Sequence, residues 1–140
     1  MSYNDYKNSM VKNSIFRAYD IRGKYLDELN EKNAFEIAKS LLKIFKGKIV
    51  VGCDARLSSP ALYKAVLNGL NSRPASINII ETGMITTPML YFLVNKLKAG
   101  GGVMVTASHN PKEYNGLKIV GEKAKMISGK EIEKLLKRSI

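Results

Sequence analysis

The chain has 140 residues, with 23 Lys and Arg against 12 Asp and Glu, for a net charge of +11. This length fits one domain with a modest hydrophobic core. No apolar run approaches the roughly 20 residues of a membrane-spanning helix, so we expect a soluble protein without a membrane partner. The basic charge suits either nucleic acid or a phosphorylated substrate, and charge alone does not choose between them.

The N-terminal region and the cysteine content indicate the cellular compartment. Residues 1–13 form a polar leader without the apolar core of a signal peptide. The single cysteine, Cys53, excludes a disulfide within the chain, and both features predict a cytoplasmic protein. Cys53 has no catalytic partner beside it in the sequence, which favours a buried structural thiol over a reactive one.

Four segments carry apolar residues at helical spacing and predict four helices. They begin at the capping residues Asn30, Ser59, Thr87 and Ser128, and the second and third have a proline in the first turn. The first helix is predicted to run to about Phe45 and to be followed by Gly47, and the second is predicted to be broken at Arg73-Pro74. The third ends before the glycines at 100–102.

Apolar segments between these helices predict strands at residues 49–51, 77–80, 102–106 and 117–120. Strands that alternate with helices predict a layered α/β domain, with loops at the strand ends available for ligands. A tight turn between the last two strands indicates an antiparallel pair. We therefore predict a mixed parallel/antiparallel sheet with flanking helices.

Three methionines and three polar segments are assigned structural roles. Met84, Met89 and Met104 are interpreted as core residues. Asp54 and Arg56 are expected to form a structural pair near the site, and the Thr86-Thr87-Pro88 segment a helix cap. Most lysines fall on predicted helix faces or in the tail, where solvation explains them, and no DNA or RNA recognition motif is present, so we expect no nucleic-acid partner.

One strand-exit loop brings together a serine, a histidine and a lysine. Thr106-Ala107-Ser108-His109-Asn110-Pro111 follows a strand and precedes Tyr114-Asn115-Gly116-Leu117-Lys118. The Asn-Pro and Asn-Gly pairs are typical of turns. A serine hydroxyl is a poor nucleophile at neutral pH unless a base, a metal or an attached phosphoryl group assists it. Taken alone, the segment favours a polar hairpin with an ordinary serine.

The wider sequence changes this interpretation, because four segments in order resemble motifs of the α-D-phosphohexomutases, the family of phosphoglucomutase and phosphomannomutase. The string 103–118 resembles the phosphoserine signature, and Phe16-Arg17-Ala18-Tyr19-Asp20-Ile21-Arg22-Gly23 resembles the N-terminal motif of the bacterial phosphomannomutase/phosphoglucomutase branch. The segments 51–59 and 83–91 resemble two further motifs of the same family. Ala107 occupies a position where close bacterial relatives often have glycine, which weakens any assignment to one branch.

The resemblance covers residues 14–140 and implies the first domain of a four-domain enzyme. The aspartate-rich metal loop of the second domain, the sugar-selecting loop of the third and the phosphate-clamping loop of the fourth are not in this sequence. We therefore expect this chain to be a fragment, rather than a natural truncation or one product of a split gene. We expect it to be inactive without domains II–IV. The sugar preference, glucose or mannose, stays open for the same reason.

The resemblance also implies a mechanism. Phosphorylated Ser108 donates its phosphoryl group to a hexose 1- or 6-phosphate, which gives glucose 1,6-bisphosphate or mannose 1,6-bisphosphate, and the sugar turns over and returns the other phosphate. Lys118 and Arg22 supply positive charge, His109 exchanges a proton, and Tyr19 bonds the sugar or its phosphate. Mg²⁺ binds the phosphate on Ser108 together with carboxylates from an absent domain.

Several alternatives remain open from the sequence. His109 can instead orient the loop through a backbone hydrogen bond, and Tyr19 can be an aromatic residue packed at the edge of the domain. A solitary non-catalytic module that binds anions or a protein partner is the main rival function, and exposed apolar side chains on one face would favour it. Nucleic-acid binding through the basic surface is a third, weaker candidate.

Overall fold

The computed structural model describes residues 13–73 and 76–138, so the predicted leader lies outside the described residues except for its last position. The strands are β1 (Ile21–Lys24), β2 (Gly47–Cys53), β3 (Ile77–Met84), β4 (Gly101–Val105), β5 (Tyr114–Gly121) and β6 (Met126–Ile127). The α-helices are α2 (Glu31–Ser40), α3 (Ser59–Leu70), α4 (Thr87–Lys96) and α5 (Gly129–Arg138). Short 3-10 helices are η1 (Asn13–Ile15), η2 (Leu41–Lys43) and η3 (Glu122–Ala124).

These strands form one mixed sheet in the order β1-β5-β4-β2-β3, with β6 paired to β5. Strand β2 is parallel to its neighbours β3 and β4, whereas β5 is antiparallel to β4, β1 and β6. The predicted mixed sheet is therefore confirmed. Strand β1 was not predicted, because its sequence Ile-Arg-Gly-Lys has one large apolar residue and owes its strand conformation to pairing with β5.

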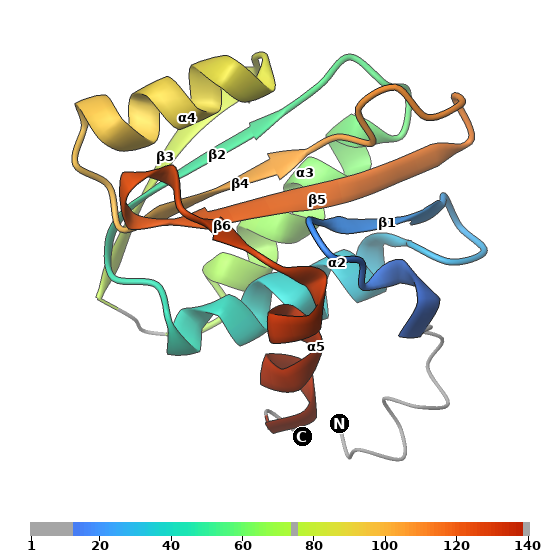
Figure 1. Ribbon diagram of the computed structural model, residues 1–140, viewed down its shortest axis with the longest axis horizontal. Helices are drawn as coiled ribbons and strands as arrows, with labels where there is room; N and C mark the ends of the chain where they lie inside the picture. The colour runs from blue at the N-terminus through green and yellow to red at the C-terminus, as the bar shows by residue number, and fades with distance from the viewer. Residues whose placement is uncertain (1–12, 74–75, 139–140) are drawn as a thin grey trace.

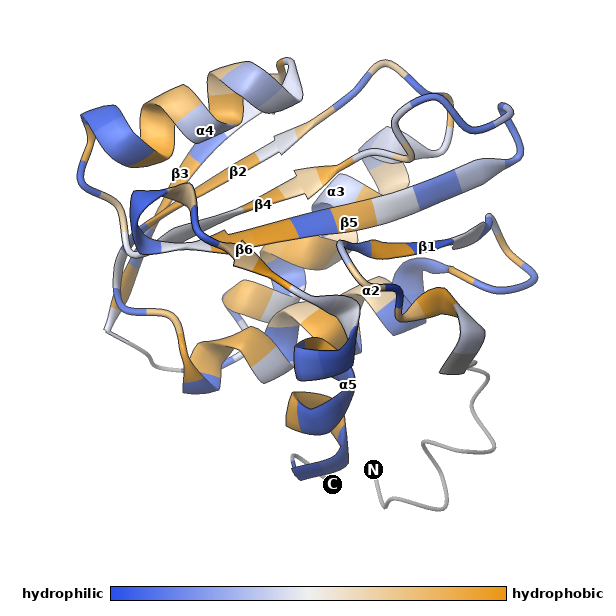
Figure 2. Ribbon diagram, in the orientation of Figure 1, coloured by the Kyte–Doolittle hydropathy of each residue, from blue (hydrophilic) through white to orange (hydrophobic). Residues whose placement is uncertain are grey.

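Helices lie on both sides of the sheet (Figure 1), and the sheet separates two hydrophobic clusters of unequal size. Helices α2, α3 and α5 pack on one face, around a core that includes Ile37, Leu62 and Ile132. Helix α4 covers part of the other face, where Leu90 and Val94 meet Met104 of β4. Figure 2 shows hydrophobic residues concentrated along the central strands and the helix faces that meet them. On this second face α4 packs against β2, β4 and η3, and the polar side chains of β1 and β5 lie beside it.

The helix starts confirm two predicted caps and correct two. Asn30 Oδ1 accepts a hydrogen bond from Asn33 N at 2.9 Å, and Ser128 Oγ accepts one from Glu131 N at 3.2 Å. The predicted Thr86-Thr87-Pro88 cap of α4 is confirmed, but the capping side chain is Thr86 rather than Thr87, since Thr86 Oγ1 accepts from Met89 N. Ser59 is also not a cap, because it lies inside α3 and its hydroxyl bonds to another side chain.

Two helices end earlier than predicted. Helix α2 ends at Ser40, whose hydroxyl donates to Ile37 O at 2.6 Å, and the chain then tightens into η2. Gly47 begins β2 rather than ending the helix, with a left-handed φ of 71°. Helix α3 ends at Leu70, before Arg73, where the chain turns at Asn71.

The methionine predictions are correct for one residue and wrong for two. Met104 is buried, with 1% of its surface exposed, but Met84 and Met89 are 68% and 45% exposed. Met84 is the last residue of the edge strand β3, and Met89 lies in the first turn of α4, whose buried residues are Leu90 and Val94. Cys53 is buried as predicted, and burial together with the nearby charge of Asp54 raises the pKa of its thiol.

Across residues 13–73 and 76–138, no helix combines the length and apolar character needed to cross a membrane.

Candidate active site

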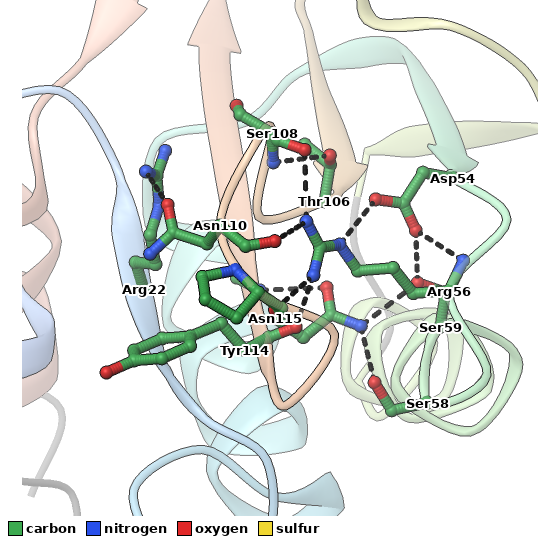
Figure 3. Close-up of polar contacts among 12 residues, drawn as sticks. Arg22, Asp54, Arg56, Ser58, Ser59, Thr106, Ser108, Asn110, Tyr114 and Asn115 are labelled. Carbon is green, nitrogen blue, oxygen red and sulfur yellow. Dashed lines mark hydrogen bonds and ion pairs between the residues drawn. The ribbon is translucent and has the colours of Figure 1, made fainter.

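The candidate site is built on the serine loop, residues 106–113, which connects β4 to β5 (Figure 3). Ser108 is exposed and has a left-handed φ of 57°. Its amide donates to Thr106 Oγ1 at 3.0 Å, and the amide of Asn110 donates to Ala107 O at 3.1 Å. These short-range bonds turn the chain sharply, so the Ser108 hydroxyl is presented to solvent just past the end of β4.

Arg56, from the segment between β2 and α3, holds this loop from one side. Its Nη2 donates to Ser108 O at 3.0 Å and to Asn110 O at 2.7 Å, and its Nη1 donates to Pro111 O at 2.7 Å and to Tyr114 O at 3.1 Å. Figure 3 shows the guanidinium enclosed by these carbonyls and by Asp54. Its Nε lies 3.3 Å from Asp54 Oδ2, which confirms the expected Asp54–Arg56 pair.

A second set of hydrogen bonds ties the end of the loop to helix α3. Asn115 is fully buried, and its Nδ2 donates to Ser58 Oγ at 2.7 Å and to Ser59 Oγ at 3.0 Å. Ser59 Oγ in turn donates to Asp54 Oδ1 at 2.5 Å. The start of β5 is therefore linked through the first turn of α3 to Asp54, the residue that follows β2.

Arg22 and Lys118 are brought together by a residue that was not predicted, Asp20. The carboxylate of Asp20, which is 5% exposed, pairs with Arg22 and lies 3.9 Å from Lys118 Nζ. Arg22 is opposite Gly116 in the β1–β5 pairing, two positions from Lys118, so both side chains lie on the same sheet face. Arg22 Nη1 also donates to Asn110 Oδ1 at 2.6 Å, which connects the cations to the serine loop.

Gly116 allows β1 and β5 to approach closely at this point. A Cβ atom there would lie 2.2 Å from Ile21 O and 3.0 Å from Thr106 O, both of them backbone atoms. A side chain at this position would push β1, and Arg22 with it, away from the loop. The glycine that the sequence suggested as a turn residue is thus a strand residue required for close packing.

One aromatic residue of α4 belongs to the same neighbourhood. Burial and the negative charge of Asp20 raise the pKa of the Tyr91 phenol. Tyr91 is half-buried on the helix that packs against this face of the sheet. Tyr91 could not be predicted as a site residue, because its position beside Asp20 depends on how α4 lies across the sheet.

His109 and Tyr19 do not take part in the hydrogen bonds and ion pairs that hold the serine loop. Both are exposed, Tyr19 to 68%, and within the described ranges neither side chain makes a hydrogen bond. The alternative in which Tyr19 is an aromatic residue packed at the edge of the domain does not fit this exposure. Its exposure leaves the phenol available to a ligand.

The described residues offer a metal few donors. Among residues 13–73 and 76–138, no three His, Cys, Asp or Glu side chains are arranged to hold a metal ion. The Ser108 oxygen is exposed and so is accessible to a metal that other ligands hold. The expectation that those ligands come from another domain stays a prediction.

The sequence and the fold match a known family. Residues 13–139 match the domain described as phosphoglucomutase/phosphomannomutase, alpha/beta/alpha domain I. An α/β/α domain of this class has the mixed sheet and flanking helices seen here. The chain belongs to the phosphoglucomutase/phosphomannomutase family, and the resemblance noted in the sequence is confirmed.

Individual relatives agree with the family match. A protein named phosphohexose mutases from Xanthomonas campestris pv. campestris is 50% identical over 114 residues, which are 81% of this chain and 25% of the relative. A phosphomannomutase from Vibrio cholerae is 41% identical over 93% of this chain and 30% of its own length. A solved family protein from Burkholderia thailandensis aligns with a TM-score of 0.79 at 35% identity, over 92% of this chain and 30% of that one. The chain thus spans about a quarter of the length of the Xanthomonas relative.

Proposed function

We propose that this chain is the serine-bearing domain of a phosphohexomutase that moves a phosphoryl group between C1 and C6 of a hexose phosphate. The observation that carries the proposal is the arrangement at one end of the sheet. Ser108 is exposed on a turn that Arg56 holds, and Arg22, itself paired with Asp20, bonds to the same loop through Asn110. An exposed hydroxyl on a loop that two arginines hold through hydrogen bonds is suited to phosphoryl transfer, which depends on positioning and charge neutralisation.

In the proposed reaction, Ser108 carries the phosphoryl group at the start. The bond between phosphorus and Ser108 Oγ breaks while a bond to a sugar hydroxyl oxygen forms, which produces glucose 1,6-bisphosphate or mannose 1,6-bisphosphate. His109, one residue along, accepts the hydroxyl proton and a proton passes to the released Ser108 oxygen, and the second transfer reverses this exchange. Return of the other phosphate to Ser108 regenerates the starting enzyme, so the net reaction is an isomerisation.

The remaining residues bind charge and sugar. Lys118 and Arg22 neutralise phosphate oxygens, and Asp20 keeps the two cations on one face of the sheet. Tyr19, with its exposed phenol, bonds the sugar or its phosphate. When bound, Mg²⁺ polarises the phosphate on Ser108 and lowers its repulsion toward the anionic substrate. We place the other metal ligands, the sugar-selecting contacts and the second phosphate site in domains II–IV, and the whole enzyme in the cytoplasm.

The first test is phosphorylation of Ser108. The chain is incubated with glucose 1,6-bisphosphate and Mg²⁺, and in parallel with mannose 1,6-bisphosphate, and is then analysed by intact mass and peptide mapping. We expect one phosphate on the peptide containing Ser108 and none in a Ser108→Ala variant. Phosphate on another peptide, or equal labelling of the variant, would contradict the assignment.

A chimera tests the need for the other domains. This chain replaces the matching region of the Vibrio cholerae phosphomannomutase, to which it is 41% identical. We expect mutase turnover from the chimera, loss of turnover on Ser108→Ala, and little or none from the isolated chain. If neither the isolated chain nor a folded chimera takes up phosphate, the enzyme proposal fails.

The rival function, a non-catalytic binding module, has one observation in its favour. Met84, Met89 and Phe92 are 68%, 45% and 57% exposed near the end of β3 and on α4. Such side chains suit contact with another protein surface or another domain. Analytical ultracentrifugation distinguishes the cases: self-association that Phe92→Glu abolishes, combined with no phosphorylation of Ser108, supports the binding module.

A further inference from the structure

We propose that Arg56 is a positioning residue for phosphoryl transfer: its guanidinium sets the conformation of the serine loop and thereby the position of the phosphate on Ser108. The inference rests on the proposed function for its effect on transfer, but not for its effect on the loop.

All of the N–H donors of the Arg56 guanidinium are used in contacts with the loop and with Asp54. An arginine side chain has five N–H donors in a planar fork. Four of them go to the carbonyl oxygens of Ser108, Asn110, Pro111 and Tyr114, at 2.7–3.1 Å, and Nε faces Asp54 at 3.3 Å. The side chain is also only 14% exposed. Arg56 therefore has no donor left for a substrate, unlike an arginine that binds phosphate directly.

The contacts orient the loop as a whole. Four carbonyls separated along the chain converge on one cation, so the negative ends of their peptide dipoles point toward Arg56. A phosphate on Ser108 carries about −1.5 to −2 charges at neutral pH, and carbonyl oxygens turned toward it would repel it. By gathering these oxygens on its own side, Arg56 leaves the other side of the loop to the Ser108 side chain.

Arg56 is itself held in place from the opposite side. Asp54 Oδ1 accepts from Arg56 N at 3.0 Å and from Ser59 Oγ, and its Oδ2 faces the guanidinium. Ser59 belongs to the first turn of α3, a helix packed into the larger core. The position of the serine loop is thus set by contacts with a packed helix and not only by its own turns, which are short and exposed.

This geometry distinguishes a positioning role from one of charge alone. Lysine keeps the positive charge, but its three donors share one nitrogen and cannot reproduce a planar fork. If Arg56 acted only through its charge, Arg56→Lys would restore wild-type behaviour. If it acts by geometry, Arg56→Lys and Arg56→Ala should share the same defect.

The structural arm of the test uses NMR on the full unphosphorylated chain. In the wild type we expect separate, slowly exchanging Nη proton signals for Arg56 at low temperature, because both Nη groups are fixed by hydrogen bonds. In both variants we expect exchange of the hydrogen-bonded amides of Ser108, Asn110 and Tyr114 to rise about tenfold while core amides of β2 and β4 stay protected. Averaged Nη signals in the wild type, or an unchanged loop in a folded variant, would overturn the proposal.

The functional arm uses the chimera. We expect kcat to fall by about a hundredfold in Arg56→Lys and Arg56→Ala, with KM changed less than about threefold, because misplacement of the reacting group affects the transition state more than substrate binding. Arg73→Ala, which removes an exposed arginine after α3, is the matched control and should leave kcat unchanged. Wild-type kcat in Arg56→Lys refutes the positioning role. If the wild-type chimera itself takes no phosphate, the proposed function fails and the NMR arm alone decides whether Arg56 sets the loop.

Discussion

Asn115 Nδ2 donates a hydrogen bond to Ser59 Oγ at 3.0 Å, in a fully buried contact that joins the start of β5 to the first turn of α3. The Asn115 carbonyl oxygen accepts from Gly116 N at 2.9 Å, so both ends of the amide are used. The serine loop is consequently fixed at its C-terminal end by a side chain and in its middle by Arg56. This relationship leads to the first prediction.

We expect Asn115→Ala to lower the free energy of unfolding by about 1–3 kcal/mol, because buried polar partners at Ser58 and Ser59 lose their donor. Asn115→Asp should cost more, since it places a second carboxylate near Asp54. Urea denaturation followed by circular dichroism measures both, with the exposed Asn68→Ala as the control. An Asn115→Ala variant as stable as wild type would mean that this hydrogen bond contributes nothing net.

The second prediction concerns Asp20, whose carboxylate pairs with Arg22 and faces Lys118 while being almost fully buried. Removing one partner of a buried ion pair leaves uncompensated charge and costs about 3–5 kcal/mol. We expect Asp20→Ala to approach this loss and to weaken phosphorylation of Ser108, because Arg22 is no longer held against β5. The exposed Asp27→Ala is the matched control. Equal stability of the two variants in urea would rule out a role for Asp20 in holding the cations.

The third prediction concerns the reactivity of the Cys53 thiol. Burial, and secondarily the charge of Asp54, raises the pKa of the thiol above its ordinary value. The thiolate is the reactive form, so alkylation of the folded chain by iodoacetamide at pH 8 should be much slower than alkylation of the chain in urea. A folded chain that reacts as fast as the unfolded one would contradict both the burial and the raised pKa.

The same shift has a consequence for stability. On raising the pH, the thiol of the unfolded chain loses its proton first, so the folded state then binds more protons than the unfolded state. The stability contributed by the neutral buried thiol is therefore present below the ordinary thiol pKa and is lost as the pH rises through the higher pKa of the folded state. Urea midpoints of wild type and Cys53→Ala should converge at alkaline pH. A constant difference across this range would show that the thiol does not titrate differently in the two states.

Much of the fold was predictable because it is encoded locally. Apolar residues at helical spacing, together with the capping side chains of Asn30 and Ser128, define helices wherever they occur in a chain. Strands β2 and β4 centre on the apolar runs Ile49-Val50-Val51 and Val103-Met104-Val105, and β5 contains the apolar run Ile119-Val120, which is typical of strands inside a sheet. The turn residues between β4 and β5 indicated their antiparallel pairing. Strand β1 was not predicted, because a short polar segment adopts the strand conformation only when it pairs with another strand.

The candidate site was predictable to the extent that it is contiguous in sequence. The segment around Ser108 carries its own turn residues and a specific family motif, so the serine, Arg22 and Lys118 could be named from the sequence. The roles of Asp20, Asn110 and Tyr91 could not, because each depends on contact between elements far apart in the chain. The exposure of Met84 and Met89 was missed for the same reason, since residue type does not say which strand lies at the edge of a sheet.

The sequence by itself therefore determined the helices, the central strands, the serine loop and the family, because periodicity, capping and turn chemistry act over a few residues. Only the tertiary structure decided what holds that loop. Arg56 lies more than fifty residues before Ser108, and its five donors find their partners only when β2, β4 and β5 are adjacent and α3 has packed into the core. Hydrogen bonds of this kind depend on distances and directions between distant segments, and those are fixed by packing rather than by local sequence.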